Sequence, residues 1–196
     1  MRNYGGPVKA IEKRIWALAL PHLRKGVRKD FVLHTKAVLR ALKLLLRREQ
    51  GDKDILIPAA ILHDVGWSTV PVYLQKAKDE KRVKEAMHRH LEDSVPIIKD
   101  ILAALNFDTM KTSKIVGIVL SHKFRNPRKL DKRLLIDADT LSDVFKEPFY
   151  ADAEQYNVGP VDFYQIRMKN SFYTQAARDI FRRELKKRAR EIGITA

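Results

Sequence analysis

Apolar residues recur along this chain with the period of an α-helix, about 3.6 residues, and not with the alternation of a β-strand. In the stretch from about residue 28 to residue 49, for example, Phe31, Val38 and Leu42 share one face. The same period predicts helices over about residues 8–23, 28–49, 54–66, 81–105, 109–122, 131–141 and 171–192. No stretch fits a strand better than a helix, so we expect an all-α fold.

Capping residues predict where some of these helices begin and end. Asp54 is expected to cap the helix over 54–66 at its N-terminus, and Gly66 to end it. Asp108 or Thr109 is expected to cap the helix that follows.

Three places depart from the helical pattern. Pro96 is expected to kink or divide the helix over 81–105. Residues 68–80 are predicted to form a loop or a broken short helix, because Pro71 interrupts them. Residues 148–164 are predicted to form an irregular segment that contains aromatic side chains.

The composition suits one helical domain over residues 1–196. The chain has 196 residues, of which 45% are hydrophobic and only 8 are glycine, so a sizeable core can form. With no cysteine, it can have neither a disulfide framework nor a thiolate site. No apolar run is long enough for a signal peptide or a membrane span, so we expect a cytoplasmic protein.

An excess of basic residues sets this chain apart. It has 39 Lys and Arg against 24 Asp and Glu, a net charge of +15 at pH 7. Such a charge raises the local concentration of polyanions, whether nucleotides, nucleic acid or acidic lipid. The helix over 171–192 carries many of these charges on one side, which is either a solvent face or a surface that docks nucleic acid without sequence specificity.

Four of the six histidines fall on the core-facing stripes of four different predicted helices. They are His34, His63, His90 and His122. A buried imidazole is costly unless it is hydrogen-bonded or binds a cation. For any one of them a hydrogen-bonded core histidine is the simpler interpretation, but for the set together we expect a metal site.

Acidic residues accompany these histidines at two places. Asp64 directly follows His63 near the end of a predicted helix, where the free carbonyl groups carry partial negative charge and favour a cation. Asp137 and Asp139 lie among apolar residues in the helix over 131–141. The helical period does not decide which of these two faces the histidines.

The order of these residues resembles the HD-domain superfamily of metal-dependent phosphohydrolases. The matching motifs are Val32-Leu33-His34-Thr35, Leu62-His63-Asp64-Val65-Gly66 and Asp137-Ala138-Asp139-Thr140-Leu141, within a region from about residue 28 to residue 145. The resemblance implies a helical bundle of the HD type and a metal held by His34, His63, Asp64 and Asp139. Asp139 matches the family's usual Ala-Asp-x-Leu setting best, and Asp137 is the alternative.

The same resemblance gives roles to the other two inward histidines. His90 and His122 are similar to intermediate histidines that some branches of the superfamily use for a second metal or for substrate phosphate. Together with Asp64 they are the candidate catalytic residues. The Gly-Tyr-Pro signature of the cyclic-dinucleotide phosphodiesterases is absent, which counts against that substrate.

The function implied is hydrolysis of a nucleotide or a similar small phosphate ester by water that a divalent ion activates. One or two ions are expected, and Mn, Fe, Mg, Co, Ni or Zn would suit nitrogen and oxygen ligands. Lys123 and Arg125, in the basic loop after His122, are candidates for binding substrate phosphate. The alternative for this loop is a solvated run of charge.

Two other functions remain open at this point. A basic helical module could bind nucleic acid through its Lys and Arg faces, although no named nucleic-acid motif is present. An inactive scaffold of the HD type could keep its metal ligands for stability alone.

Overall fold

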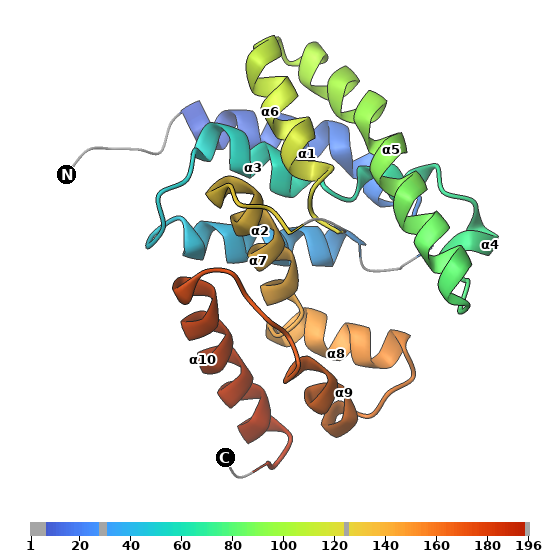
Figure 1. Ribbon diagram of the computed structural model, residues 1–196, viewed down its shortest axis with the longest axis vertical. Coiled ribbons are helices and arrows are strands. Elements are labelled where there is room, and N and C mark those ends of the chain that lie inside the picture. The colour runs from blue at the N-terminus through green and yellow to red at the C-terminus, as the bar shows by residue number, and fades with distance from the viewer. Residues whose placement is uncertain (1–6, 28–30, 124–125, 195–196) are drawn as a thin grey trace.

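The computed structural model describes residues 7–27, 31–123 and 126–194 (Figure 1). The described part of the chain contains helices and no strand, which confirms the all-α prediction. The α-helices are α1 (Pro7–Leu23), α2 (Phe31–Leu45), α3 (Lys53–Leu62), α4 (Val72–Gln75), α5 (Glu80–Ala104), α6 (Thr109–Val119), α7 (Leu130–Ser142), α8 (Lys146–Gln155), α9 (Pro160–Arg167) and α10 (Gln175–Glu191). A 3₁₀ turn, η1 (Val65–Ser68), follows α3.

Helices α2, α3, α6 and α7 pack side by side around the main hydrophobic core (Figure 1). Helix α2 lies against both α7 and α3, and α3 lies against α6. Helix α5 packs on η1, while α1 covers α3 and η1 from the outside. Helices α8, α9 and α10 form the lower part of the molecule in Figure 1, where α10 contacts α7.

Aspartates cap several helices at the N-terminus, as expected, although one cap is displaced from its predicted place. The carboxylate of Asp108 accepts a hydrogen bond from the backbone N–H of Lys111 at 2.9 Å, as a cap of α6 should. Helix α3 is capped by Asp52, whose carboxylate accepts from the N–H of Asp54 at 3.0 Å. The prediction that Asp54 is the cap was therefore wrong by two residues.

Gly66 does not end α3. The helix ends at Leu62, and Gly66 lies within η1. A Cβ atom on Gly66 would overlap the carbonyl oxygen of His90 and come within 2.9 Å of the backbone nitrogen of Ser94. Glycine is required here because it lets η1 lie directly against the backbone of α5.

Helix α5 continues through Pro96 without a break, so the predicted division does not occur. Residues 148–164 also differ from the prediction, since they form α8 and α9 instead of an irregular segment. Burial explains the difference: the rings of Phe149 and Phe163 are both in the core, with their centroids 5.1 Å apart. Tertiary packing of this kind overrides a weak local pattern.

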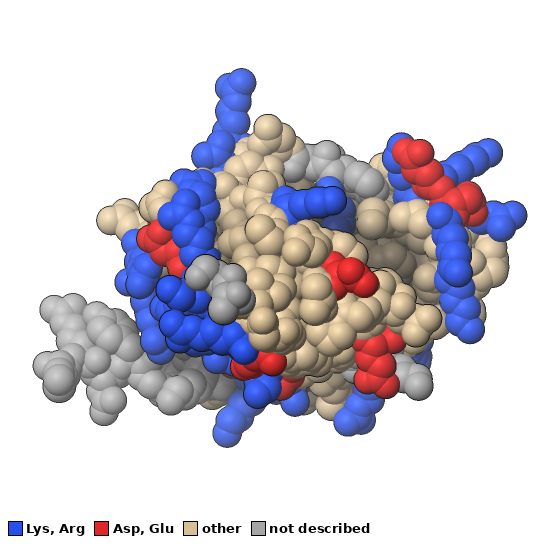
Figure 2. Space-filling model, turned by 90° about the horizontal axis from the view of Figure 1, so that it is seen from below, with Lys and Arg blue, Asp and Glu red and all other residues tan. Residues whose placement is uncertain are grey.

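Helix α10 begins at Gln175, four residues later than predicted, with Thr174 as its cap. It buries Ile180 and Phe181 and exposes basic side chains, which gather on the left side of the view in Figure 2. The exposed basic residues of α10 are Arg182, Arg183, Lys186, Lys187 and Arg190, and Arg178 is half-buried. None of the helices in the described ranges is both long enough and apolar enough to cross a membrane.

The close approach at Gly66 predicts a specific loss of stability. Gly66→Ala should reduce the free energy of unfolding by about 1–3 kcal/mol, because the added methyl group forces η1 away from α5. Gly117→Ala is the matched control: its Cβ meets nothing within 4 Å in the last turn of α6, so it should stabilise the protein by about 0.5–1 kcal/mol. Urea unfolding measures both, and equal effects of the two substitutions would contradict the assignment.

Candidate metal centre

The end of α3 positions His63 and Asp64. His63 is the C-cap of α3, and its Nδ1 donates a hydrogen bond to the carbonyl oxygen of Ala60 at 2.9 Å. This carbonyl belongs to the last turn, where helical hydrogen-bond partners run out. Because the ring proton is on Nδ1, the Nε2 atom of a neutral His63 presents a lone pair to the interior.

The end of α6 repeats this arrangement with His122. His122 lies three residues beyond Val119, and its Nδ1 donates to the carbonyl oxygen of Val119 at 2.6 Å. Burial lowers the pKa of His122 well below its usual value, so the ring is neutral. Its Nε2 therefore also presents a lone pair.

His34, in α2, is oriented by Ser142 at the end of α7. The hydroxyl of Ser142 donates to the carbonyl oxygen of Asp139 at 2.7 Å, so its one hydrogen is already used. The contact of 3.3 Å between Ser142 Oγ and His34 Nδ1 then requires the imidazole to be the donor. A neutral His34 thus presents Nε2, like the other two histidines, without a proton.

Four side chains, from α2, from the end of α3 and from α7, converge around these atoms. The Nε2 atom of His34 lies 3.3 Å from the Nε2 of His63 and 3.1 Å from Oδ1 of Asp139. Both nitrogens lie 3.3 Å from Oδ2 of Asp64. Two lone pairs and two carboxylate oxygens at this separation repel one another unless positive charge lies among them.

The pKa shifts of these side chains also indicate that positive charge is favoured at this place. Burial by itself would raise the pKa of Asp64, but His63 and His34 hold it well below its usual value. Burial by itself would lower the pKa of His63, but Asp64 and Asp139 raise it to about 10. The carboxylates therefore attract a positive charge, which protons or a divalent cation can supply.

A second group of donors shares Asp64 with the first. Its Oδ1 atom lies 3.5 Å from Nε2 of His90 and 4.0 Å from Nε2 of His122. All three atoms are buried, and none has a hydrogen-bond partner in the described part of the chain. Buried polar atoms without partners are costly, so these three residues could hold a cation of their own.

Trp67 holds His90 in place. The two rings stack with their centroids 4.6 Å apart and an angle of 9° between their planes. Burial lowers the pKa of His90 to about 4, so its imidazole is neutral and can offer a lone pair.

The structure brings Asp139 to the first group and does not bring Asp137 there. The carboxylate of Asp137 instead accepts hydrogen bonds from the backbone N–H groups of Tyr173 and Thr174, each at 2.8 Å, and from the Thr174 hydroxyl at 2.7 Å. Asp137 thus fastens the segment that leads into α10.

Of the two basic residues predicted to bind phosphate, Lys123 lies at the centre and Arg125 lies outside the described residues. The ammonium group of Lys123 forms an ion pair of 2.7 Å with Oδ2 of Asp139. Burial alone would raise the pKa of Asp139, but Lys123 and His34 keep it well below its usual value. Lys123 therefore also keeps Asp139 ionised.

A cleft of about 930 Å³ leads from the surface to these groups. His34, Asp64, Lys123 and Asp139 lie at its floor, with α4 and α5 on one side and α7, α8 and α9 on the other. Figure 2 shows the hollow between the α8–α9 face and the charged side chains at the start of α5.

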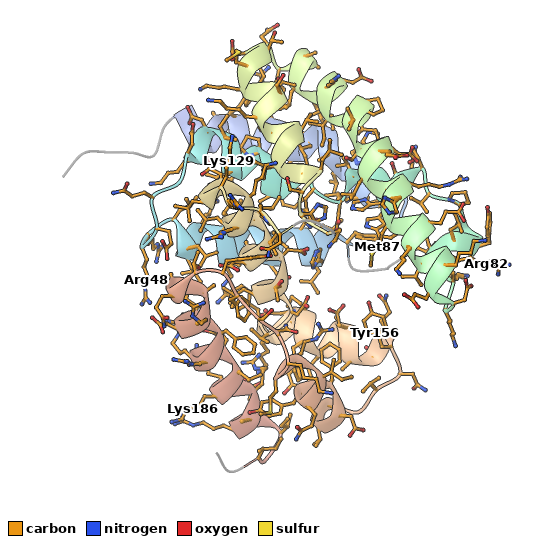
Figure 3. The ribbon with its side chains drawn as sticks, in the orientation of Figure 1. Arg48, Arg82, Met87, Lys129, Tyr156 and Lys186 are labelled. Atoms are coloured by element: carbon orange, nitrogen blue, oxygen red, sulfur yellow. The ribbon has the colours of Figure 1, made fainter. Side chains whose placement is uncertain are left out.

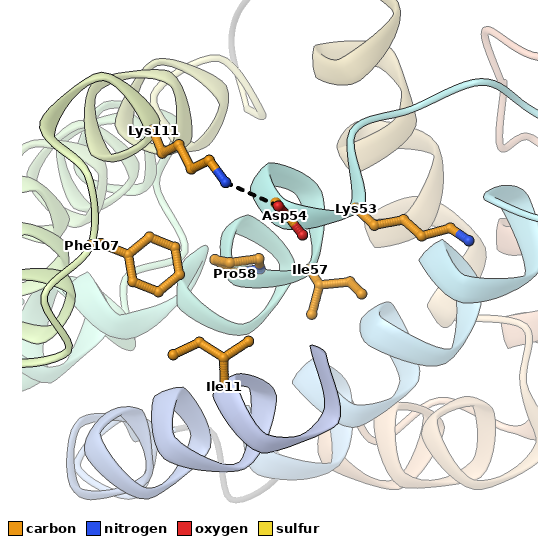
Figure 4. Close-up of a pocket in the computed structure, with 7 residues that line it drawn as sticks. All are labelled: Ile11, Lys53, Asp54, Ile57, Pro58, Phe107 and Lys111. Carbon is orange, nitrogen blue, oxygen red and sulfur yellow. Dashed lines mark hydrogen bonds and ion pairs between the residues drawn. The ribbon is translucent and has the colours of Figure 1, made fainter. Parts of the chain in front are cut away.

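A second cavity, of about 250 Å³, lies between α1, α3 and α6 (Figure 4). Ile11, Ile57 and Phe107 line it, and an ion pair of 2.9 Å between Lys111 and Asp54 crosses its rim. Its lining has no histidine and is mostly apolar, so the larger cleft is the candidate site.

The sequence analysis did not identify three residues that support the site, Ser142, Trp67 and Gly66. It named Gly66 only as the end of a helix. Ser142 could have been found, because it lies three residues after Asp139 and so on the same face of the helix. The stacking of Trp67 on His90 joins distant parts of the chain and leaves no signal in the sequence.

The HD domain family model matches residues 31–144, more than half of the chain. The chain belongs to the HD domain family. The crystal structure of a predicted HD superfamily hydrolase from an uncultured Thermotogales bacterium, at 1.45 Å resolution, resembles this HD protein with a TM-score of 0.62. The two are 21% identical, and the match covers 92% of this chain and 88% of the other, so the fold is shared. No curated protein matches the chain.

The different places of the two aspartates predict different results for Asp137→Asn and Asp139→Asn. Asp137→Asn should lower the free energy of unfolding by about 2–3 kcal/mol, because an amide cannot accept all three hydrogen bonds. It should leave the affinity for Mn²⁺ as in the wild type. Asp139→Asn should weaken Mn²⁺ binding by more than about tenfold.

Urea unfolding and calorimetric titration with Mn²⁺ separate the two effects. Loss of Mn²⁺ affinity in Asp137→Asn but not in Asp139→Asn would show that the ligand has been assigned to the wrong residue.

Proposed function

We propose that this HD protein is a divalent-metal-dependent phosphohydrolase that acts on a nucleotide or a similar small phosphate ester. The observation that carries the proposal is the pair of buried donor groups that share Asp64 at the floor of a deep cleft. Membership of the HD domain family supports a metal-dependent hydrolase.

The first ion would be held by Nε2 of His34 and His63, Oδ2 of Asp64 and Oδ1 of Asp139. The second would be held by Oδ1 of Asp64 with His90 and His122. Each group has two imidazole nitrogens and at least one carboxylate oxygen, a set that suits Mn, Fe, Co, Ni or Zn better than Mg.

A divalent ion in this position polarises a phosphoryl group and lowers the pKa of water. The low pKa of Asp64 makes its carboxylate a ligand rather than a proton acceptor. His90 and His122 are neutral and offer lone pairs, so they are better suited to hold an ion than to donate a proton to the leaving oxygen. Asp64, His90 and His122 thus contribute to catalysis by fixing charge beside the phosphate.

Lys123 lies between the centre and the cleft, with 23% of its side chain exposed. One of its N–H groups is directed to Asp139, and an ammonium has three. The other two are available to a phosphate oxygen that enters the cleft. Lys123 would then orient both Asp139 and the substrate phosphate.

A second candidate function rests on a different observation, the exposed basic face of α10. This face could dock nucleic acid in addition to hydrolysis at the centre. Binding that weakens steeply with salt and persists in His63→Ala would identify it.

The proposal predicts that purified protein loaded with Mn²⁺ releases phosphate from members of a panel of nucleotides and small phosphate esters. His63→Ala and His90→Ala should each lower kcat/KM by about a hundredfold or more, because each removes a ligand of an ion that stabilises the transition state. His88→Ala is the matched control, since His88 lies on the same helix as His90 and is exposed. It should retain activity within about twofold.

Chelation with EDTA should abolish turnover, and added Mn²⁺ should restore it. Full activity in His63→Ala would defeat the proposal. A protein that loses only melting temperature on chelation and never releases phosphate would be a scaffold rather than an enzyme.

A further inference from the structure

We propose that the mouth of the cleft recognises a planar, uncharged ring on the organic part of the substrate, with Tyr156 and Met87 as the residues that determine this specificity. The inference rests on the proposed function, because it assigns the part of the ester that lies beyond the phosphate. Nothing at the metal centre itself requires it.

The shape of the cleft fixes where that part of the substrate must lie. The floor is closed by the buried side chains of His34 and Asp64, which are 4% and 3% exposed. A phosphate at the floor can therefore carry its organic group only outward along the cleft, whose walls include residues of α5 and the end of α8. A volume of about 930 Å³ leaves room there for a group of nucleoside size.

Met87 and Tyr156 lie on opposite sides of this outward path, Met87 on α5 and Tyr156 at the end of α8 (Figure 3). Val83, one turn before Met87 on α5, also lines the cleft. One wall of the cleft thus has a thioether and an aliphatic side chain, and the other has a phenol ring. Flat rings stack well between such surfaces.

The backbone holds Tyr156 in this position. Tyr156 is the C-cap of α8, and Asn157 after it has a φ of 52°. The N–H of Val158 donates to the carbonyl oxygen of Ala153 at 2.9 Å, and the N–H of Asn157 to that of Glu154 at 3.0 Å. This pattern is a Schellman motif, which fixes the chain as it leaves the helix. Tyr156 is nevertheless 55% exposed, so its ring is accessible to a ligand.

The neighbours of Tyr156 set the charge of the group that fits. Glu154 and Gln155 line the same wall and are exposed. Their oxygens can accept hydrogen bonds from hydroxyl or amino groups. The negative charge of Glu154 disfavours an anionic group at this position, so an uncharged ring with such donors, as in a nucleoside, fits best.

The test compares two phosphate esters, adenosine 5′-monophosphate and glycerol 3-phosphate, with protein loaded with Mn²⁺. Tyr156→Ala should lower kcat/KM for adenosine monophosphate about tenfold, mainly through KM, because stacking on an aromatic side chain is lost. It should change kcat/KM for glycerol 3-phosphate by less than about twofold. Tyr156→Phe should behave as the wild type with both esters, since it keeps the ring.

Tyr73→Ala is the matched control. Tyr73 is 62% exposed on helix α4 but does not line the cleft. Its replacement by alanine should therefore change kcat/KM for neither ester. Equal losses with both esters in Tyr156→Ala, or no loss with either, would overturn the inference.

A binding measurement separates this inference from the proposed function. Titration calorimetry with a phosphonate analogue of adenosine monophosphate, which cannot be hydrolysed at its phosphorus–carbon bond, needs no turnover. Binding that weakens about tenfold in Tyr156→Ala and not in Tyr73→Ala supports the ring site, even if the protein hydrolyses neither ester and the proposed function fails. Binding of equal strength in both variants would overturn it.

Discussion

The centre of this protein depends on one electrostatic constraint: lone pairs and carboxylates face one another at close range in a buried place. The ring protons of His34 and His63 are directed outward, to Ser142 and to the carbonyl of Ala60, so their Nε2 atoms meet at 3.3 Å with the oxygens of Asp64 and Asp139 around them. Only positive charge makes this arrangement favourable. The same constraint extends to the second group, whose atoms have no hydrogen-bond partner among the described residues.

The fold satisfies this constraint with ordinary features of helices. The ends of α3 and α6 leave carbonyl groups without helical partners, and His63 and His122 each cap one of them while turning Nε2 inward. Gly66 then allows η1 to lie against α5, which brings His90 beside Asp64. Helix α7 supplies both Asp139 and, one turn later, the serine that orients His34. The contacts that pack these helices together therefore also orient the candidate metal ligands.

The sequence predicted the all-α fold and the four inward histidines because both depend on periodicity, which is local. The family resemblance favoured Asp139 over Asp137, but the helical period could not choose between them, because which of the two faces the histidines depends on what packs against the helix. The contacts of Asp137 with Tyr173 and Thr174 join residues far apart in the chain. Residues 148–164 were missed for the same reason, because Phe149 and Phe163 stabilise α8 and α9 through the core. The cap of α3 was predicted two residues too late, at Asp54 instead of Asp52, because both aspartates lie close to the start of the helix.

The basic residues that give the chain its net charge of +15 and the acidic centre lie in different parts of the molecule. Basic residues on α10 lie at the surface, whereas Lys123 at the centre is paired with Asp139.

The central claim is that the buried histidines and aspartates of the centre hold metal. It is tested most directly by anomalous diffraction from crystals grown with Mn²⁺. The account predicts one peak in contact with His34, His63, Asp64 and Asp139, and a second in contact with Asp64, His90 and His122. Crystals saturated with Mn²⁺ that show no peak in contact with His34, His63 and Asp64 would contradict it.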